Sequence, residues 1–478
     1  MILTLMIQMA FTDNQDTICA PASGTGGAVS IIRISGGNCF RVVDSLVSFR
    51  KGDAASSEGY RLKRGHFLDL DDVLVGIFKA PHSYTGEDGA EIYCHASPYI
   101  VSCILDQLCS HGCRMAEPGE FTRRAFLNGK MDLAQAESVA DVISSSSAAQ
   151  HRIAMNQLRG GYSEELRSIR EHLVELSALL ELELDFSDED VEFADRSRLK
   201  GLLEETQRRC SELADSFRIG NAIKNGVPVA IVGAPNSGKS TLLNALVKDD
   251  RAIVSDIPGT TRDTIEETCI LGGILFRFID TAGIRESSDK IEKMGIERSF
   301  SKLREASVVI GLTDGTQPTR EVLEQISSIA DHIDFETQKL IIAVNKNDEG
   351  DAEETFNKNV SELNAFVISS DLLKSSASVL SISAKKRSGI EKLEKALVET
   401  CQISNSEEIL VTNARHAKAL KESSEALGKV SAGLDAGIPT DLLAEDLREA
   451  LSLLGTITGE ICSNEILGEI FSRFCIGK

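Results

Sequence analysis

A glycine-rich segment, Gly233–Ser240, limits the folds open to this chain because it matches the phosphate-binding loop (P-loop) pattern G-x-x-x-x-G-K-[ST] and directly follows an apolar run at Val227–Val232. In such a loop the backbone N–H groups face the phosphates, Lys239 reaches the β and γ oxygens, and the Ser240 hydroxyl can ligate magnesium. The apolar run after the loop predicts a helix whose N-terminus completes the anion site. We therefore expect a nucleoside triphosphate site; the alternative is a glycine-rich turn with an exposed lysine.

Two apolar runs downstream end in residues that suit such a site. The first, Ile274–Ile279, leads into Asp280–Gly283, where a carboxylate can hold the metal through water and a glycine N–H can meet the γ-phosphate. The second, Leu340–Val344, leads into Asn345–Asp348. A carboxylate there can accept hydrogen bonds from both N1–H and the exocyclic amine of guanine. Adenine has no such donor pair, so we expect the ligand to be GTP.

A fourth apolar run, Val379–Ile382, leads into a loop that resembles the one behind the guanine in GTPases. Ligands of open α/β sheets bind at the carboxyl ends of the strands, where all these motifs stand. Residues 227–398 therefore resemble a Ras-like GTPase domain, with a mostly parallel sheet and helices on both faces. The predicted nucleotide contacts outside the switch segments are Asn236, Ser237, Gly238, Lys239, Ser240, Thr241, Asn345, Lys346, Asp348, Ser383, Ala384 and Lys385.

The polar segment 251–263 is expected to fold over the nucleotide as switch I, with Thr261 as the second magnesium ligand. Ile284 stands where Ras-like proteins carry the glutamine that orients the attacking water, so another group has to do this. The amide oxygen of Asn236, with switch I carbonyls, could hold a potassium ion that replaces an arginine finger. Taken singly, each residue is equally compatible with a solvated loop. The predicted contacts in the switches are Ser255, Asp256, Ile257, Pro258, Gly259, Thr260, Thr261, Asp280, Thr281, Ala282 and Gly283.

The length of 478 residues is enough for about three domains. Leucines recur at three- and four-residue steps in 131–217 and again in 405–478, which predicts amphipathic helices. Neither stretch obviously makes a core alone. We therefore expect the two to pack together as one helical domain, into which the GTPase domain is inserted through a polar linker at 220–226.

Composition bears on partners and compartment. Acidic residues outnumber basic ones by 73 to 51, a net charge of −22, and no basic face of the kind that holds RNA phosphates is evident. Eleven cysteines without a C-x-x-C pair argue against zinc and for a reduced cytosol. No run approaches the ~18 apolar residues of a membrane span, and Met1–Met9 lacks the basic residues of a signal peptide. We expect a cytoplasmic protein.

Motifs outside the GTPase region give the chain a resemblance to one family. They are Asp16–Ile18, Arg33–Gly36, Ser83–Asp88 with Glu91 and His95, Pro118–Thr122, Arg124–Lys130, Asp132–Glu137 and Phe474–Lys478. With them the chain resembles the MnmE (TrmE) family of tRNA-modification GTPases. This implies an α+β folate-binding and dimerisation domain at 1–128, an all-α helical domain in two parts at 129–225 and 399–478, and an inserted α/β P-loop GTPase domain at 226–398.

The resemblance also implies a reaction. Members of the family modify the wobble uridine of certain tRNAs together with an FAD-binding partner, MnmG (GidA), adding an aminomethyl-type group such as carboxymethylaminomethyl at uracil C5. The one-carbon unit comes from a folate, and the 5-formyltetrahydrofolate site maps to Arg33, Glu91, Lys130 and Lys478. A pterin ring presents a guanine-like donor edge that the carboxylate of Glu91 can accept. Taken alone, each of these charges would more often be a solvated surface group.

A potassium-dependent GTPase and a homodimer are further implications of the resemblance. The potassium ligands map to Asn236, Ser255, Ile257 and Thr260, and the residue that orients the water maps to Glu292. The candidate catalytic residues are Lys239, Arg285, Glu292 and Cys475. Two departures from the family pattern, Thr25 and His95–Ser97, touch the surroundings of the folate pocket and not the GTPase site.

A second function stays open at this point. The chain could be a GTP-dependent molecular switch that recruits an assembly partner without modification chemistry of its own. The P-loop does not separate the two functions. The folate motif and Cys475 favour the modifying enzyme, because a switch needs neither. The acidic charge is consistent with a partner that supplies much of the tRNA-binding surface.

Overall fold

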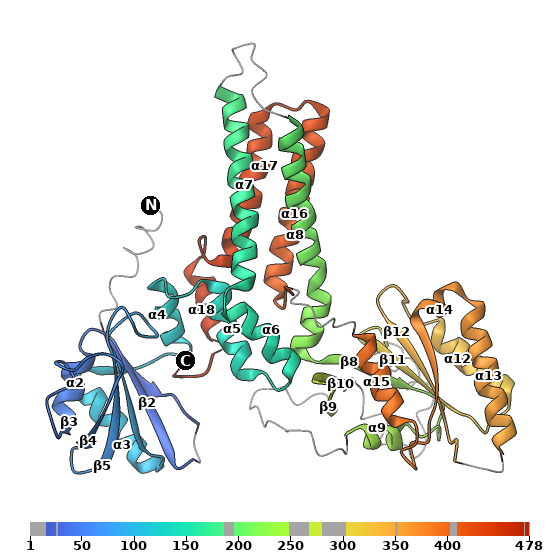
Figure 1. Ribbon diagram of the computed structural model, residues 1–478, viewed down its shortest axis with the longest axis horizontal. Coiled ribbons are helices and arrows are strands. Elements are labelled where there is room, and N and C mark those ends of the chain that lie inside the picture. Colours follow the sequence, from blue (N-terminus) through green and yellow to red (C-terminus); the bar gives the residue numbers. More distant parts are fainter. Residues whose placement is uncertain are drawn as a thin grey trace. The chain divides into compact units, whose positions relative to one another are not determined.

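The computed structural model describes most of the chain, in the ranges 16–24, 27–185, 196–247, 267–279, 303–348, 352–401, 409–472 and 474–477. The chain divides into two compact units, of which unit 1 takes residues 1–140, 156–210 and 419–478, and unit 2 takes 141–155 and 211–418. Each unit combines one sheet with helices (Figure 1). The unit boundaries fall within helices, so they do not test the four predicted domain bounds, which stay a prediction.

The sheet of unit 1 has seven strands in the order β3-β4-β5-β6-β2-β1-β7. It is antiparallel except where β1 pairs with β7. Its strands are β1 (Thr17–Pro21), β2 (Val29–Ser35), β3 (Val47–Phe49), β4 (Arg61–Phe67), β5 (Asp71–Phe78), β6 (Gly89–His95) and β7 (Cys113–Met115). The pairing of β2 with β6 sets Arg33 opposite Glu91.

One face of this sheet carries the core of the N-terminal region. Ile32, Ile34 and Ile92 are fully buried and pack in one cluster with residues of α2 (Cys39–Leu46) and α3 (Pro98–Ser110). Successive side chains of a strand point to opposite faces. Arg33 and Glu91 therefore project from the other face, on the side away from these two helices.

The remaining helices of unit 1 include α4 (Glu120–Leu127) and α18 (Asn464–Ser472). A capping box begins α5 (Leu133–Ser144), since Gln135 N donates to Asp132 Oδ1 at 2.8 Å and Asp132 N donates to Gln135 Oε1 at 3.0 Å. The apolar face of α5 packs with Phe471 and Phe474. Residues from the middle and the end of the chain thus share one small core.

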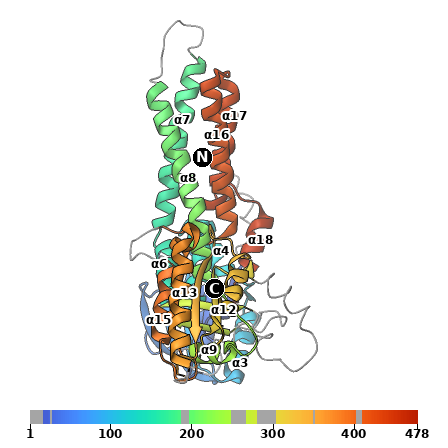
Figure 2. The same ribbon diagram turned by 90° about the vertical axis from the view of Figure 1, so that its right-hand side faces the viewer.

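Long helices from both sides of the GTPase region lie side by side in both views (Figures 1 and 2). They are α7 (Gly161–Asp185), α8 (Arg196–Asn225), α16 (Ala414–Ala436) and α17 (Thr440–Thr458), with the shorter α6 (Ala148–Leu158) before them. Within unit 1, α7 and α17 pack along their length. They bury leucines that the periodicity marks: Leu173, Leu176, Leu180, Leu443, Leu447 and Leu454. The expected packing of the two helical stretches is confirmed.

The sheet of unit 2 has six strands in the order β13-β12-β11-β8-β10-β9, all parallel except the edge strand β9. They are β8 (Val227–Val232), β9 (Glu267–Leu271), β10 (Ile274–Ile279), β11 (Val308–Asp314), β12 (Lys339–Asn345) and β13 (Ala377–Ser381). The four apolar runs of the sequence fall on β8, β10, β12 and β13. The predicted strands of the GTPase domain are therefore present.

Helices cover both faces of this second sheet. One core cluster packs α9 (Lys239–Val247) and α15 (Ile390–Thr400) against it, and the other packs α12 (Thr319–Ala330) and α13 (Glu353–Ser369), with α14 (Asp371–Ser376) preceding the last strand. Strands buried on both sides read as continuous apolar runs, which is the pattern of β11 and β12. The expected α/β fold is confirmed.

The linker expected at 220–226 is wrong. Helix α8 continues to Asn225, and only Gly226, at φ +85°, leaves the helical conformation. The buried side chain of Ile223 keeps the helix going, because it packs in the core of unit 2. A Cβ on Gly220 would lie 2.2 Å from the carbonyl oxygen of Val411, so this glycine serves close packing rather than a turn.

No helix in the described part of the chain combines the length and the apolar character needed to cross a membrane.

Candidate functional site

The P-loop of unit 2 joins β8 to α9 in a backbone shape that its residue types permit. Asn236 lies at φ +62° and Gly238 at φ +101°. A Cβ on Gly238 would stand 2.4 Å from the side-chain amide nitrogen of Asn345, and one on Gly233 would stand 2.1 Å from the carbonyl oxygen of Leu312. Both glycines of the motif are thus required by close approach of neighbouring strand ends.

The buried side chain of Asn345 joins three of the predicted motifs. It is only 4% exposed at the end of β12. Its amide donates to the carbonyl of Ser237 in the P-loop at 2.8 Å, and its oxygen accepts the N–H of Ala384 at 2.9 Å. The P-loop, the segment after β12 and the segment after β13 therefore meet at one edge of the sheet, as the sequence predicts.

The carboxylate of Asp348 is held by a hydrogen bond from Ser383. Ser383 Oγ donates to Asp348 Oδ1 at 2.6 Å, and the same hydroxyl accepts the N–H of Lys386 at 3.0 Å. The hydrogen bond from Ser383 lowers the pKa of Asp348. The group is therefore an ionised acceptor at neutral pH, which is the state that a guanine edge with two N–H donors requires.

Two lysines of the site are already engaged. Lys239 donates to the carbonyl oxygens of Gly233 and Ala234 at 2.8 and 2.9 Å, and burial lowers its pKa. Lys346 donates to Asp314 Oδ2 at 2.5 Å. The carbonyl partners of Lys239 are neutral, so a phosphate would be a stronger partner for its ammonium group.

Sequence reasoning missed Asp314, the partner of Lys346. Its carboxylate also accepts the N–H and the hydroxyl of Thr316. Two signals point to it in retrospect: Asp314 ends the apolar strand β11, and β11 lies between β8 and β12 in the sheet. A charged residue at the carboxyl end of a central parallel strand belongs to the edge where ligands bind.

Fourteen of the predicted site residues lie outside the described residues. They are Ser255, Asp256, Ile257, Pro258, Gly259, Thr260, Thr261, Asp280, Thr281, Ala282, Gly283, Arg285, Glu292 and Lys478. Strand β10 ends at Ile279, the residue before Asp280, and pairs in parallel with β8. Ser240 and Thr241 fall in the first turn of α9, and Lys385 is exposed after β13.

A separate pocket lies on the N-terminal sheet of unit 1. Its volume is about 500 Å³ when the solvent at its open mouth is included. It is lined by Arg33, Ile34, Ser35, Tyr60, Phe78, Ser83, Tyr84, Thr85, Gly89, Ala90, Glu91 and Phe121. Arg33 pairs with Glu91, with Nη2 and Nε at 2.9 and 3.0 Å from Oε1. The hydroxyl of Tyr93 donates to Oε2 at 2.9 Å. The pocket thus presents an aligned carboxylate among aromatic rings.

Aromatic rings also surround the guanidinium of Arg33. Its Cζ lies 5.4 Å from the ring centroid of Tyr84 and 5.7 Å from that of Phe121. Both distances are in the range of a cation–π contact. Apolar walls around a few oriented polar groups are typical of small-molecule sites.

The C-terminal residues reach this pocket. Arg33 Nη1 donates to the carbonyl of Gly477 at 3.2 Å. Phe474 is buried and anchors the tail, while Cys475 is exposed. Of the predicted folate residues, Arg33 and Glu91 line the pocket. Lys130 instead donates to the carbonyl of Pro81 at 2.9 Å, at the base of the loop that carries Ser83, Tyr84 and Thr85.

Two family models match this chain. The family model described as the TrmE N-terminus of a GTP-binding protein matches residues 17–130, and the one described as the MnmE helical domain matches residues 133–475. The second match begins and ends outside the GTPase region. It therefore supports a GTPase domain inserted into a helical domain.

Curated relatives match nearly the whole chain. The tRNA modification GTPases MnmE of Bacteroides thetaiotaomicron and Flavobacterium johnsoniae are each 48% identical to it, over 97% of this chain and 100% of theirs. The corresponding protein of Porphyromonas gingivalis is 48% identical over 97% of this chain and 98% of its own.

One solved structure that resembles part of this chain is a GTP-binding protein. A crystal structure of Aquifex aeolicus Era bound to GDP and AlF4− has 26% identity and a TM-score of 0.28, and covers 42% of this chain and 66% of that one. The assignment rests instead on the family matches and on the full-length identity. The chain belongs to the MnmE family of tRNA modification GTPases.

Proposed function

We propose that this chain is the potassium-dependent, GTP-hydrolysing subunit of a complex that modifies the wobble uridine of tRNA. In this proposal the chain acts as a cytoplasmic homodimer with an FAD-dependent partner of the MnmG (GidA) kind, and a folate supplies the one-carbon unit for an aminomethyl-type group at uracil C5. The observation that carries the proposal is the junction at Asn345, which joins the phosphate and guanine motifs in a member of this family.

Guanine recognition follows from the chemistry of the loops after β12 and β13. Asp348, ionised and held by Ser383, is suited to accept the two N–H donors of guanine. Lys346 is anchored by Asp314 at the same sheet edge. An adenine would set its N1 acceptor and the C2–H against the carboxylate in place of two N–H donors, and this mismatch selects GTP.

The oxygen donors near the P-loop fit two cations. The Ser240 hydroxyl in the first turn of α9, with Thr261 as second ligand, is a hard oxygen donor of the kind that Mg²⁺ takes. Asn236 adopts a left-handed backbone conformation in the loop and would ligate K⁺ with Ser255, Ile257 and Thr260. When bound, the two cations would offset negative charge on the β- and γ-phosphates. Glu292 would orient the attacking water.

The N-terminal pocket suits a pterin. Glu91 offers a carboxylate held by Arg33 and Tyr93, and Oε2, which accepts from Tyr93, keeps a lone pair for a donor edge such as N–H beside NH₂. Tyr84 and Phe121 supply aromatic surface. Cys475, exposed on the tail that bonds to Arg33, is the nucleophilic side chain of that segment.

The second candidate is a GTP switch that only recruits a partner. The pocket with its docked tail favours the modifying enzyme, because a switch has no use for an aligned carboxylate and a thiol in a separate unit. The net charge of −22 fits a chain whose partner supplies much of the tRNA-binding surface.

The test is steady-state GTP hydrolysis by the full chain in KCl and then in NaCl at equal ionic strength. Strong potassium dependence is expected, and tetrahydrofolate binding measured on the same preparation by calorimetry should be saturable. Equal rates in the two salts would overturn the cation assignment. Absence of folate binding would leave the switch as the better description.

A further inference from the structure

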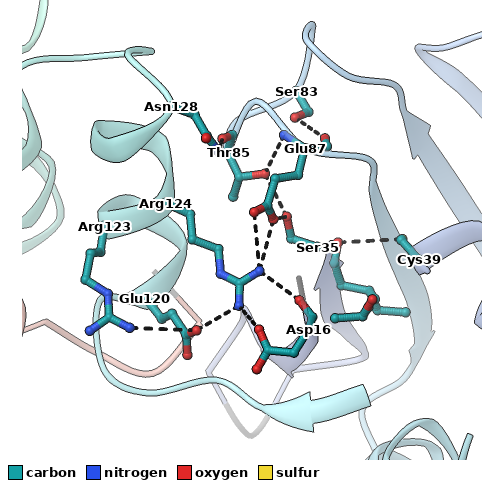
Figure 3. A network of polar contacts seen from close by, with 12 residues as sticks. Asp16, Ser35, Cys39, Ser83, Thr85, Glu87, Glu120, Arg123, Arg124 and Asn128 are labelled. Atoms are coloured by element: carbon teal, nitrogen blue, oxygen red, sulfur yellow. Dashed lines mark hydrogen bonds and ion pairs between the residues drawn. The ribbon is translucent and has the colours of Figure 1, made fainter. Parts of the chain in front are cut away.

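Four charged side chains of unit 1, Asp16, Arg114, Glu120 and Arg124, form a closed ring beside the N-terminal pocket. Figure 3 shows Asp16, Glu120 and Arg124 of this ring. Asp16 accepts hydrogen bonds from Arg114 and Arg124, each at 2.7 Å. Glu120 accepts from the same two arginines, at 2.7 and 2.9 Å. Asp16, Glu120 and Arg124 belong to three sequence motifs that the nucleotide site does not use. The ring ties the start of β1, the end of β7 and the first turn of α4 to one another.

Two of the four members of this ring are shielded from solvent, whereas the side chains of Asp16 and Arg114 are 36% and 40% exposed. Glu120 has 0% and Arg124 only 5% exposure. Burial alone would raise the pKa of Glu120, but hydrogen bonds from Arg114, the Glu117 N–H and Arg124 lower it. Removing a partner from such a group leaves a buried charge uncompensated. The geometry around Arg124 is therefore constrained.

Glu87 connects the ring to the wall of the pocket. Arg124 Nη1 lies 3.3 and 3.2 Å from its two carboxylate oxygens, and Ser35 Oγ donates to Oε2 at 2.8 Å. Ser35 has one hydroxyl proton, so in its 2.7 Å contact with Thr85 the proton has to come from Thr85. The hydrogen bonds therefore run in one direction, from Thr85 to Ser35 to Glu87.

This directed chain fixes the loop that carries the lining residues. Ser83 Oγ donates to the carbonyl of Glu87, and Asn128 donates to the carbonyl of Thr85 at 2.7 Å. Tyr84, between Ser83 and Thr85, contacts Arg33 with its ring and lies 2.9 Å from Thr122 Oγ1 with its hydroxyl. A shift of the loop would therefore move an aromatic wall of the pocket.

Helix α4 carries residues of the ring and residues of the pocket wall next to each other. Glu120 and Arg124 join the ring, while Phe121 and Thr122 contact the pocket side. Phe121 is held by its packing with Ile18, Ala20 and Ala116, whereas the Glu87 branch sets the position of Tyr84. The two rings flank the same guanidinium, that of Arg33.

We propose that Arg124, acting through Glu87, is a positioning residue for the N-terminal pocket: it holds the 83–88 loop so that Tyr84 and Arg33 stand in the arrangement that binds the ligand. The identity of that ligand as a folate rests on the proposed function. The positioning itself rests on the contacts of Glu87 and Arg124 and does not need the ligand to be identified.

The test compares Glu87→Gln with Arg114→Lys in the full-length chain. Glu87→Gln turns an amide N–H toward one of the donors, Arg124 or Ser35, and so releases the loop, whereas Arg114 touches the ring and not Glu87. We expect Glu87→Gln to raise the Kd for tetrahydrofolate about tenfold and to speed amide hydrogen exchange at residues 83–88. Binding is measured well below the melting temperature, where a purely stabilising residue leaves Kd unchanged.

Arg114→Lys should lower the melting temperature and keep Kd within about twofold of the wild-type value. Arg124→Lys keeps the positive charge and loses the forked guanidinium. It should change both the melting temperature and the Kd. Unchanged exchange at 83–88 and unchanged Kd in Glu87→Gln would overturn the positioning role. If the wild-type chain binds no tetrahydrofolate, the proposed function fails, and the exchange rates alone decide whether Glu87 holds the loop.

Discussion

The side-chain amide of Asn345 donates to the backbone carbonyl of Ser237 at 2.8 Å, so the residue that begins the guanine motif also supports the P-loop. The two residues are 108 positions apart in the chain. Because Asn345 also accepts the N–H of Ala384, one side chain sets the spacing of three loops. The predicted guanine motif and the P-loop are therefore joined through one side chain.

Replacing Asn345 by alanine should weaken nucleotide binding, because the side chain supports the loops of the site. The effect does not require Asn345 to contact the nucleotide itself. The change leaves the carbonyl of Ser237 and the N–H of Ala384 unpaired in a buried site, at a cost of about 1–3 kcal/mol each. We expect GDP affinity to fall at least about tenfold. Fluorescent-nucleotide titration measures this.

Asn347→Ala is the matched control for that change, since Asn347 is exposed and makes a longer bond, 3.3 Å, to Ser381. It should bind GDP like the wild-type protein. Equal losses in the two variants would mean that the junction at Asn345 is not what supports the P-loop.

The ion pair between Asp314 and Lys346 predicts a pH dependence. Burial alone would raise the pKa of Asp314, but hydrogen bonds from Lys346 and Thr316 lower it below its ordinary 3.8. The folded state thus binds this proton less readily than the unfolded chain. The stabilisation is complete above the unfolded value and is lost as the pH falls through the lower folded value.

Asp314→Asn should accordingly lower the melting temperature by roughly 2–4 °C near neutral pH, and the difference from the wild type should shrink as the pH falls below the ordinary 3.8. Thermal melts in a pH series measure it. Asp331→Asn, at an exposed position after α12, is the control for the loss of a surface carboxylate and should melt close to the wild type near neutral pH. A constant difference across the series would contradict the role of the charge.

Sequence motifs anticipate the nucleotide edge because a parallel sheet brings every strand's carboxyl end to one place. Val227–Val232 and Ile274–Ile279 were strands with the predicted bounds, and the loops after β12 and β13 meet the P-loop. The motifs do not predict which side chains of different strands become partners. Asp314 looks like any acid after a strand until the register of β11 and β12 sets it beside Lys346.

The N-terminal pocket shows the same limit more strongly. Asp16, Glu87 and Arg124 stand in three separate motifs, and only the folded sheet and α4 bring them together. The error at 220–226 has a different origin, because polar composition there suggested a linker while one buried side chain, Ile223, keeps the helix intact. A polar composition fits the solvated face of a helix as well as it fits a loop, so it does not distinguish the two.

Glu292→Ala separates binding from hydrolysis in the proposed mechanism. The side chain is assigned to the water and not to the nucleotide, so GTP affinity should stay at the wild-type value while kcat falls about 100-fold or more. Single-turnover hydrolysis measures the loss. Glu286→Ala, a neighbouring charge, should hydrolyse GTP normally, and Lys239→Ala should not bind it. Normal turnover in Glu292→Ala would remove that residue from the mechanism.

Gly477→Ala tests whether the docked tail shapes the pocket. Gly477 lies at φ +93°, and a Cβ there would stand 2.1 Å from the carbonyl oxygen of Pro21, so alanine has to displace the tail. Arg33 then loses the Gly477 carbonyl, and we expect tetrahydrofolate affinity to fall about tenfold. Isothermal titration of the full chain measures the change.

Gly468→Ala is the counterpart within the same C-terminal segment. Gly468 lies inside α18, and a Cβ there meets no atom within 4 Å, so alanine should stabilise the helix by roughly 0.5–1 kcal/mol and leave folate binding unchanged. Gly468 and Gly477 are less than about ten residues apart, and each variant adds one methyl group. A difference in tetrahydrofolate affinity between the two variants therefore reports on the docking of the tail. Wild-type affinity in Gly477→Ala would mean that Arg33 binds the ligand without the tail, and the thiol of Cys475 would then have to reach the pocket from a tail held by Phe474 alone.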